Sequence, residues 1–239
     1  RSSLLVAAGL AGLALFFGMD ALKPRSRLFP SRLFSWRTPV GAGMTMVAAL
    51  SVATCSFTIY GPLLLTSLHD IPILTTGYII AAESIAWSIL SIAVAGMRLE
   101  RDGPVIVVGA LMIAAGLAGF AYTIPAGSIP LILLCALLQG GGFGVAWPFV
   151  TRLIVAAAPR DEQTIASAAV PTMQRIGYAV GAAVAGVVAN ASGFSEGLNR
   201  EAAGHVAGLL FLAFIPLGIV GCLAAMRAST FGQPREAMG

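Results

Sequence analysis

Long apolar segments with very few charged side chains are the feature that most constrains this chain. Seven of them follow one another along the 239 residues, separated by short polar stretches. About 20 apolar residues in a helix cross the hydrocarbon core of a bilayer, and lipid offers no partner to unpaired backbone groups. The sequence therefore predicts an all-α, polytopic transmembrane helix bundle. The predicted spans are 3–19, 40–67, 72–97, 104–124, 128–157, 163–190 and 204–226.

The composition excludes other classes of protein. Charged residues make up 10% of the chain, against about 25% in a soluble domain. A membrane β-barrel would show alternating segments of about ten residues instead of long apolar runs. The three cysteines, Cys55, Cys135 and Cys222, lie inside apolar segments without the spacing of a disulfide framework or metal site. We expect no enzymatic activity, no metal, no cofactor and no nucleic-acid partner.

Lysine and arginine gather on one side of the predicted membrane. If the spans alternate, the stretch 20–39, the loops 98–103 and 158–162 and the C-terminal tail share the arginine-rich side. The opposite side has Arg200 as its only loop arginine or lysine. Cytoplasmic loops carry such an excess. Arginine also outnumbers lysine 13 to 1, a bias of GC-rich bacterial genomes. We therefore expect a bacterial inner (plasma) membrane protein with a cytoplasmic C-terminus.

The chain divides into four predicted parts. Its first residue is not methionine and its first apolar segment is short, so we expect residues 1–19 to be an extra span with a truncated start. Residues 20–39 mix arginines with Leu, Phe and Trp, a pattern of a segment lying on the inner leaflet; the alternative is a solvated loop. Residues 40–226 form a six-span bundle, and 227–239 form a cytoplasmic tail.

Two ionisable residues, Glu83 and Arg175, lie deep inside predicted spans. At 1.5 Å per helical residue, Glu83 lies roughly 16 Å from the outer end of its span, and Arg175 roughly 18 Å from the inner end of its own. Both therefore reach about the midplane, where secondary transporters place substrate and ion sites. A charge at that depth costs about 2.5–3.5 kcal/mol on insertion scales, which marks both residues as candidate functional groups.

Polar and aromatic side chains recur every three or four residues on several spans, so each span presents a stripe suited to a cavity rather than to lipid. We expect these stripes to enclose a wet, partly aromatic cavity within the bundle. Its candidate lining residues are Thr58, Tyr60, Trp87, Gln139, Phe143, Trp147, Arg175 and Tyr178.

Three roles for Glu83 fit the sequence. It can carry a proton during a transport cycle, bind a cationic substrate, or hold helices together by pairing with Arg175 or bonding to a neighbouring helix. Arg175 does not release its proton at ordinary pH, so it is structural, binds an anion or influences Glu83. Trp87 and Trp147 are packing residues or substrate contacts.

One loop introduces a family resemblance. Residues 96–103 read GMRLERDG, which is similar to the cytoplasmic loop motif G-x-L-x-D-R-x-G of the major facilitator superfamily. Gly96, Arg101 and Gly103 match, Glu100 replaces the aspartate, and Arg98 departs from the leucine position. Loops of this kind gate the cytoplasmic side in that family, and the resemblance implies this role for the matching positions and Glu100.

Residues 137–150, LLQGGGFGVAWPFV, resemble the family's fourth-helix motif R-x-x-Q-G-x-G. Gln139, Gly140 and Gly142 match, but Ala136 occupies the arginine position. That arginine usually belongs to the N-terminal half of these transporters, so its absence is typical of a C-terminal half and leaves proton coupling unassigned by this motif.

Residues 172–190, TMQRIGYAVGAAVAGVVAN, resemble the Arg-Leu-Gly-x-x-x-Gly stretch in the penultimate span of fourteen-span drug:proton antiporters. Arg175, Gly177 and Gly181 match, and Ile176 replaces the leucine. The basic linker at 20–39 also suits that subfamily.

The resemblance covers essentially the whole chain and implies the C-terminal half of a multidrug-efflux antiporter. The expected function is proton-coupled efflux of amphipathic organic compounds by alternating access. The expected partners are the lipid bilayer, a small-molecule substrate, protons and the missing N-terminal half of the same transporter. Two alternatives stay open: transport of an anionic metabolite anchored by Arg175, and a non-transporting membrane receptor or scaffold that retains the fold.

Overall fold

The computed structural model describes residues 2–22, 27–97, 102–192 and 200–231, in which the regular elements are α-helices. Each predicted span corresponds to one helix, and no helix end differs from the predicted end by more than four residues. The all-α class is therefore confirmed. The helices are α1 (Ser2–Leu22), α2 (Pro39–His69), α3 (Ile73–Val94), α4 (Asp102–Ala126), α5 (Ile129–Ala157), α6 (Gln163–Ala191) and α7 (Arg200–Ser229).

Five of these helices are long and apolar enough to cross a membrane: α2, α3, α4, α5 and α7, the last from Val206 onward. Helix α1 contributes a shorter apolar stretch, Val6–Leu22. Helix α6 has 29 residues but carries a polar stripe that includes Gln174 and Arg175, which lowers its hydropathy. Lipid disfavours such a stripe, so it is expected to face protein or a water-filled cavity.

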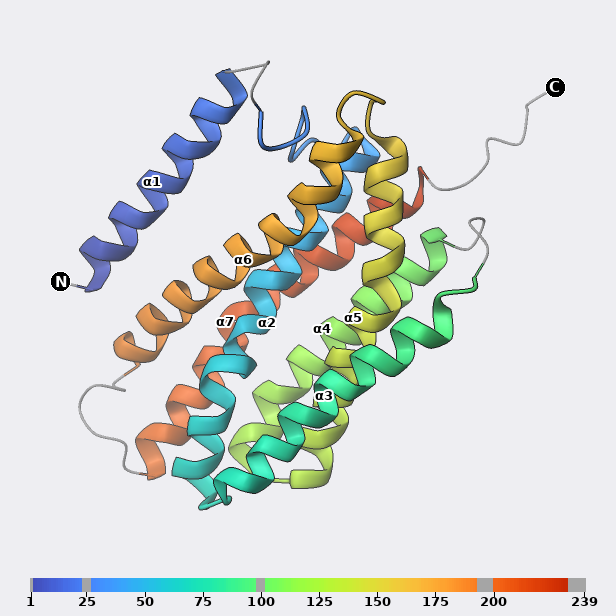
Figure 1. The fold of residues 1–239 in the computed structure, drawn as a ribbon. Helices are drawn as coiled ribbons and strands as arrows, with labels where there is room; N and C mark the ends of the chain where they lie inside the picture. Colours follow the sequence, from blue (N-terminus) through green and yellow to red (C-terminus); the bar gives the residue numbers. More distant parts are fainter. Residues whose placement is uncertain (1, 23–26, 98–101, 193–199, 232–239) are drawn as a thin grey trace.

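Helix α2 runs through the middle of the bundle (Figure 1) and is 83% buried along its most apolar stretch. It packs against α4, α5, α6 and α7, and more lightly against α3. Helix α3 is the opposite case, because it packs chiefly on α5 and is only 6% buried over its apolar stretch. Helix α1 stands beside the bundle and touches α6 alone among the described helices (Figure 1).

Glycines on α5 allow α3 and α4 to approach its backbone from two sides. A Cβ atom at Gly140 or Gly144 would collide with the main chain of α3, at Glu83 and Trp87 respectively. A Cβ at Gly142 would lie 2.6 Å from the Gly109 carbonyl oxygen on α4. The glycine run therefore brings three helices into backbone contact, and it sets Glu83 and Trp87 directly against α5.

Gly140 and Gly144 form a G-x-x-x-G pair, and of the two further pairs on α6 and α7, one packs closely. A Cβ at Gly181 would lie 2.6 Å from the Val52 carbonyl oxygen, so α6 rests on α2 at this pair, Gly177/Gly181. The other pair does not make a close approach, since the nearest atom to a Cβ at Gly204 would be 3.8 Å away and Gly208 has none within 4 Å.

The arginine-rich segments meet at one end of the bundle, where α1, α3, α5 and α7 end and α2, α4 and α6 begin (Figure 1). The linker that precedes α2 is held there by bonds from the Ser31 amide and hydroxyl to Glu162 (2.9 and 3.0 Å) and by Arg227 Nε to the Trp36 carbonyl (2.9 Å). Helix α1 also runs three residues past the predicted boundary at residue 19, which places Asp20 inside the helix.

Candidate functional site

A cavity of about 490 Å³ opens between α3 and α6, two helices that make no contact with each other. Helices α2 and α5 supply its remaining walls. Its volume lies in the range of small-molecule sites. The lining residues are Thr54, Cys55, Thr58, Ile59, Ile80, Glu83, Ser84, Trp87, Gln139, Phe143, Tyr178 and Ala179.

Glu83 and Gln139 form the polar centre of this cavity. Gln139 is fully buried, and its Nε2 donates a 2.9 Å hydrogen bond to Glu83 Oε1. Its own Oε1 has no hydrogen-bond partner among the described residues. The close packing of α3 on Gly140 fixes the height of Glu83 against Gln139. The cavity therefore presents the Glu83 carboxylate as an acceptor to a ligand that donates hydrogen bonds, whereas the Gln139 amide oxygen is buried.

Aromatic rings border the carboxylate on one side. Trp87 stacks on Phe143 with ring centroids 4.9 Å apart and an interplanar angle of 13°. Trp147 packs against Phe143 from behind, at 5.1 Å, but it is not part of the cavity lining. Trp87 and Phe143 thus supply an apolar, polarisable wall within one helical turn of Glu83.

Helix α6 closes the opposite wall through Tyr178. The Tyr178 hydroxyl accepts a 3.2 Å hydrogen bond from Gln174 Nε2, one turn earlier on the same helix. The Tyr178 carbonyl accepts a bond from the Cys55 thiol at 3.2 Å, which joins α6 to α2. Both bonds hold the ring at the cavity edge.

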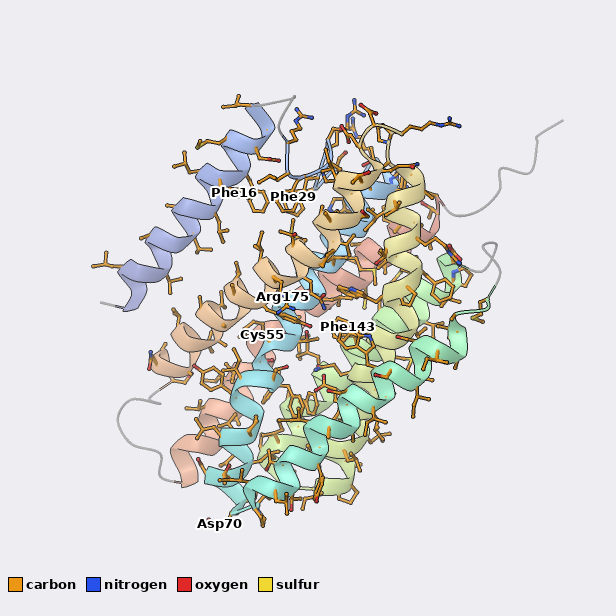
Figure 2. The ribbon with its side chains drawn as sticks, viewed as in Figure 1. Phe16, Phe29, Cys55, Asp70, Phe143 and Arg175 are labelled. Carbon is orange, nitrogen blue, oxygen red and sulfur yellow. The ribbon has the colours of Figure 1, made fainter. Side chains whose placement is uncertain are left out.

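The structure does not bring three of the expected residues into the lining. Arg175 is exposed on α6 and makes no ion pair with Glu83; Figure 2 shows it at the level of Cys55 and Phe143. Tyr60 lies farther along α2, where its hydroxyl would be 3.6 Å from a Cβ at Gly186. Trp147 stands behind Phe143. The expected residues in the lining are Thr58, Glu83, Trp87, Gln139, Phe143 and Tyr178.

The lining also holds six residues that were not among the expected lining residues: Cys55, Ile59, Thr54, Ile80, Ser84 and Ala179. Helical spacing is the signal that could have found the first two, because Cys55, Thr58 and Ile59 are three and four residues apart and so share a face. Ala179 has no distinctive chemistry and follows only from its place beside Tyr178.

The proposed gating loop is described only in part. Glu100 and Arg101 lie outside the described residues. Gly96 follows α3 and is exposed, and a Cβ at Gly103 would lie 3.0 Å from the Ser229 carbonyl oxygen at the end of α7. Next to Gly103, buried Asp102 pairs with Arg152 of α5, whose Nε lies 2.9 Å from Asp102 Oδ2. The sequence did not single out this ion pair, because its partners are 50 residues apart.

An all-α bundle with apolar spans around a central carboxylate and a small-molecule-sized cavity has the build of a polytopic membrane transporter. The sequence pattern described as Major Facilitator Superfamily matches residues 1–182 and, overlapping them, 45–237. The chain belongs to this superfamily. It is therefore a multi-pass membrane protein of a transporter family and not of an enzyme family.

Curated relatives agree with this assignment. A protein named "Probable multidrug-efflux transporter" from Mycobacterium tuberculosis is 33% identical over 178 residues, which cover 71% of this chain and 36% of the relative. A "Multidrug resistance protein B homolog" from the same organism is 27% identical over 184 residues, covering 75% of this chain and 34% of that protein. The chain thus spans about a third of the length of the curated relatives it matches.

Proposed function

We propose that this chain is the C-terminal half of a proton-coupled exporter of amphipathic organic compounds, and that Glu83 is its proton-coupling or cation-binding carboxylate. The observation that carries the proposal is the cavity between α3 and α6, with Glu83 at its polar centre. The names of the relatives, multidrug-efflux transporter and multidrug resistance protein, support the efflux assignment.

The chemistry of the lining supports a basic, amphipathic substrate. The Glu83 carboxylate at the polar centre is a hydrogen-bond acceptor that can carry a negative charge, and Trp87 offers an aromatic face to a cation. The remaining lining is largely aliphatic or hydroxyl-bearing. The ammonium group of such a substrate can therefore bind at Glu83, while the apolar part of the substrate packs along Trp87 and Phe143.

The placement of charges supports the proposed orientation. The end of the bundle that holds Arg32, Arg160 and Arg227 would face the cytoplasm under the positive-inside rule, in a bacterial inner membrane. The absent N-terminal half would then face the open cleft between α3 and α6, and the two halves would rock around the cavity in alternating access. The six helices α2–α7 would form the bundle, with α1 as an additional span.

The proposal is tested with the full-length protein that contains this chain, reconstituted in liposomes with a pH-sensitive dye inside. Lipophilic amines should evoke proton flux, and matched carboxylic acids of the same size should not. Flux with acids alone would favour an anion transporter anchored by Arg175. An absence of substrate-dependent flux across a broad panel would overturn the transport proposal and favour a receptor or scaffold.

A further inference from the structure

A second pocket lies outside the central cavity, at the arginine-rich end of the bundle. It has a volume of about 370 Å³ and is formed by the last turns of α1 and the linker that precedes α2. We call it the linker pocket. Its lining residues are Phe17, Asp20, Ala21, Arg27, Phe29, Pro30, Ser31, Arg32, Leu33, Phe34 and Ser35.

Among the described residues of the linker pocket, Arg27 has incomplete hydrogen bonding at a buried atom. One terminal nitrogen, NH2, donates to the Ala21 carbonyl at the end of α1, at 3.0 Å. The Nε atom is buried and has no hydrogen-bond partner among the described residues. A buried donor on a charged group is costly to leave unpaired, and a guanidinium presents its donors in a fork that matches phosphate oxygens.

The carboxylate of the pocket is already occupied by the backbone. Asp20 accepts from the amides of Leu28 and Phe29, at 2.6 and 3.2 Å, so its charge is used to fold the linker over α1. Arg32 adds a second positive charge to the lining, from a backbone position with a φ of 61°. The described lining therefore holds two guanidinium groups and a single carboxylate that is already bonded to backbone amides, a set of charges that favours an anionic ligand.

Apolar rings form the rest of the linker pocket. Phe17 contacts Phe29 and Phe34, with ring centroids 5.3 and 6.0 Å apart, and Leu33 completes this wall. A phosphate site for a free, hydrated anion would not need three aromatic rings beside it. A phospholipid needs both parts, because its headgroup phosphate continues into glycerol and acyl chains.

We propose that the linker pocket binds the phosphodiester headgroup of a membrane phospholipid, with the phosphate on Arg27 and the glycerol region against Phe17, Phe29 and Phe34. The bound lipid would join α1 to the bundle, because the linker that carries Arg27 is also bonded to Glu162 through Ser31. The proposal depends on the membrane location of the protein and not on the proposed efflux activity.

The test is native mass spectrometry of the full-length protein in detergent, titrated with phosphatidylglycerol. The wild type should retain one lipid more tightly than all others. Arg27→Gln should weaken that first binding event by about tenfold or more, as loss of a charged hydrogen bond implies. Arg160→Gln is the matched control, because Arg160 is an exposed arginine at the same end of the bundle and should not change the first event.

A second variant separates binding from folding. Ala21→Phe leaves every charge in place and fills the pocket, so it should also weaken the first lipid while the melting temperature in lipid-free detergent stays at the wild-type value. Equal first binding by wild type, Arg27→Gln and Ala21→Phe would overturn the proposal. So would displacement of the lipid by millimolar inorganic phosphate, which would assign the site to a free anion.

Discussion

One hydrogen bond and one pair of stacked aromatic rings define the surroundings of the Glu83 carboxylate. Its distance from the end of the predicted span placed Glu83 near the membrane midplane, but that distance does not determine which neighbour the side chain faces. The structure turns Glu83 toward Gln139 and leaves Arg175 exposed. At the scale of single residues, the partner of Glu83 is therefore the Gln139 amide and not the Arg175 guanidinium.

The bond between Glu83 and Gln139 should appear as a measurable coupling energy. In a double-mutant cycle of Glu83→Leu and Gln139→Leu, unfolding in mixed detergent–SDS micelles should give a coupling of about 1–2 kcal/mol, the scale of interhelical hydrogen bonds in membranes. A coupling near zero would mean that the two side chains do not act on each other in the folded protein.

Trp87 should contribute to the binding of aromatic or cationic substrates. Its stack on Phe143 exposes an aromatic face to the cavity, and such contacts add about 0.5–1.5 kcal/mol. Trp87→Leu should therefore weaken the binding of a fluorescent lipophilic cation by about twofold to tenfold. Trp36→Leu, in the exposed part of the linker, is the control. Equal losses in both variants would contradict a role for Trp87 in the cavity.

At the scale of helices, glycine positions determine how the site is assembled. Gly140 and Gly144 let the backbone of α3 lie directly on α5, and Ser91 donates to the Gly144 carbonyl at 3.2 Å. Helix α3 has few other contacts. The placement of Glu83 and Trp87 therefore depends on a narrow strip of small residues on α5.

A methyl group in that strip should loosen α3. Gly144→Ala would place its Cβ 3.0 Å from the Ser91 amide nitrogen and closer still to the Trp87 carbonyl, so we expect a loss of about 1–3 kcal/mol in unfolding free energy. Gly208→Ala is the control, because no atom lies within 4 Å of the added Cβ, and it should be neutral or stabilising. Similar stability in both variants would show that α3 can shift at no cost.

The sequence predicted the positions of the helices better than it predicted which side of each helix lines the cavity. Span ends followed from the limits of the apolar segments. At the start of α2 the structure adds a cap, in which Thr38 Oγ1 accepts from the Gly41 amide at 3.1 Å. Six of the expected site residues share the cavity. Tyr60 and Trp147 do not, because their stripes were assigned on single helices, whereas the packing of four helices decides which part of each stripe meets the others. The spacing of Gly204 and Gly208 matched a packing motif that α7 does not use.

At the scale of the whole molecule, the arrangement is a bundle with one open side. Helices α3 and α6 flank the cavity without touching, and α3 leaves large apolar residues exposed, among them Ile85 at 57% and Ile92 at 77%. In a bilayer these residues would face lipid or the proposed N-terminal half. The cleft between α3 and α6 is the surface where the proposed N-terminal half would complete the cavity.

The proposed orientation can be checked by labelling from outside the cell. Ser128 and Arg160 lie just outside the two ends of α5, a helix of 29 residues that is about 43 Å long. In cysteine-free full-length protein, Ser128→Cys should react with a membrane-impermeant maleimide in intact cells, and Arg160→Cys only after permeabilisation. The reverse pattern would place the arginine-rich end outside.

The most direct test of the account is a comparison of two transport modes in one proteoliposome preparation of the full-length protein. Efflux driven by an imposed pH gradient requires proton coupling, whereas exchange of labelled for unlabelled substrate without a gradient requires only binding and alternating access. Glu162→Gln, a carboxylate variant at the α5–α6 turn, is the control. We predict that Glu83→Gln abolishes gradient-driven efflux, whereas exchange continues with a weaker apparent affinity because the carboxylate that binds the ammonium group is lost. Gradient-driven efflux by Glu83→Gln at the wild-type rate would contradict the role assigned to this residue.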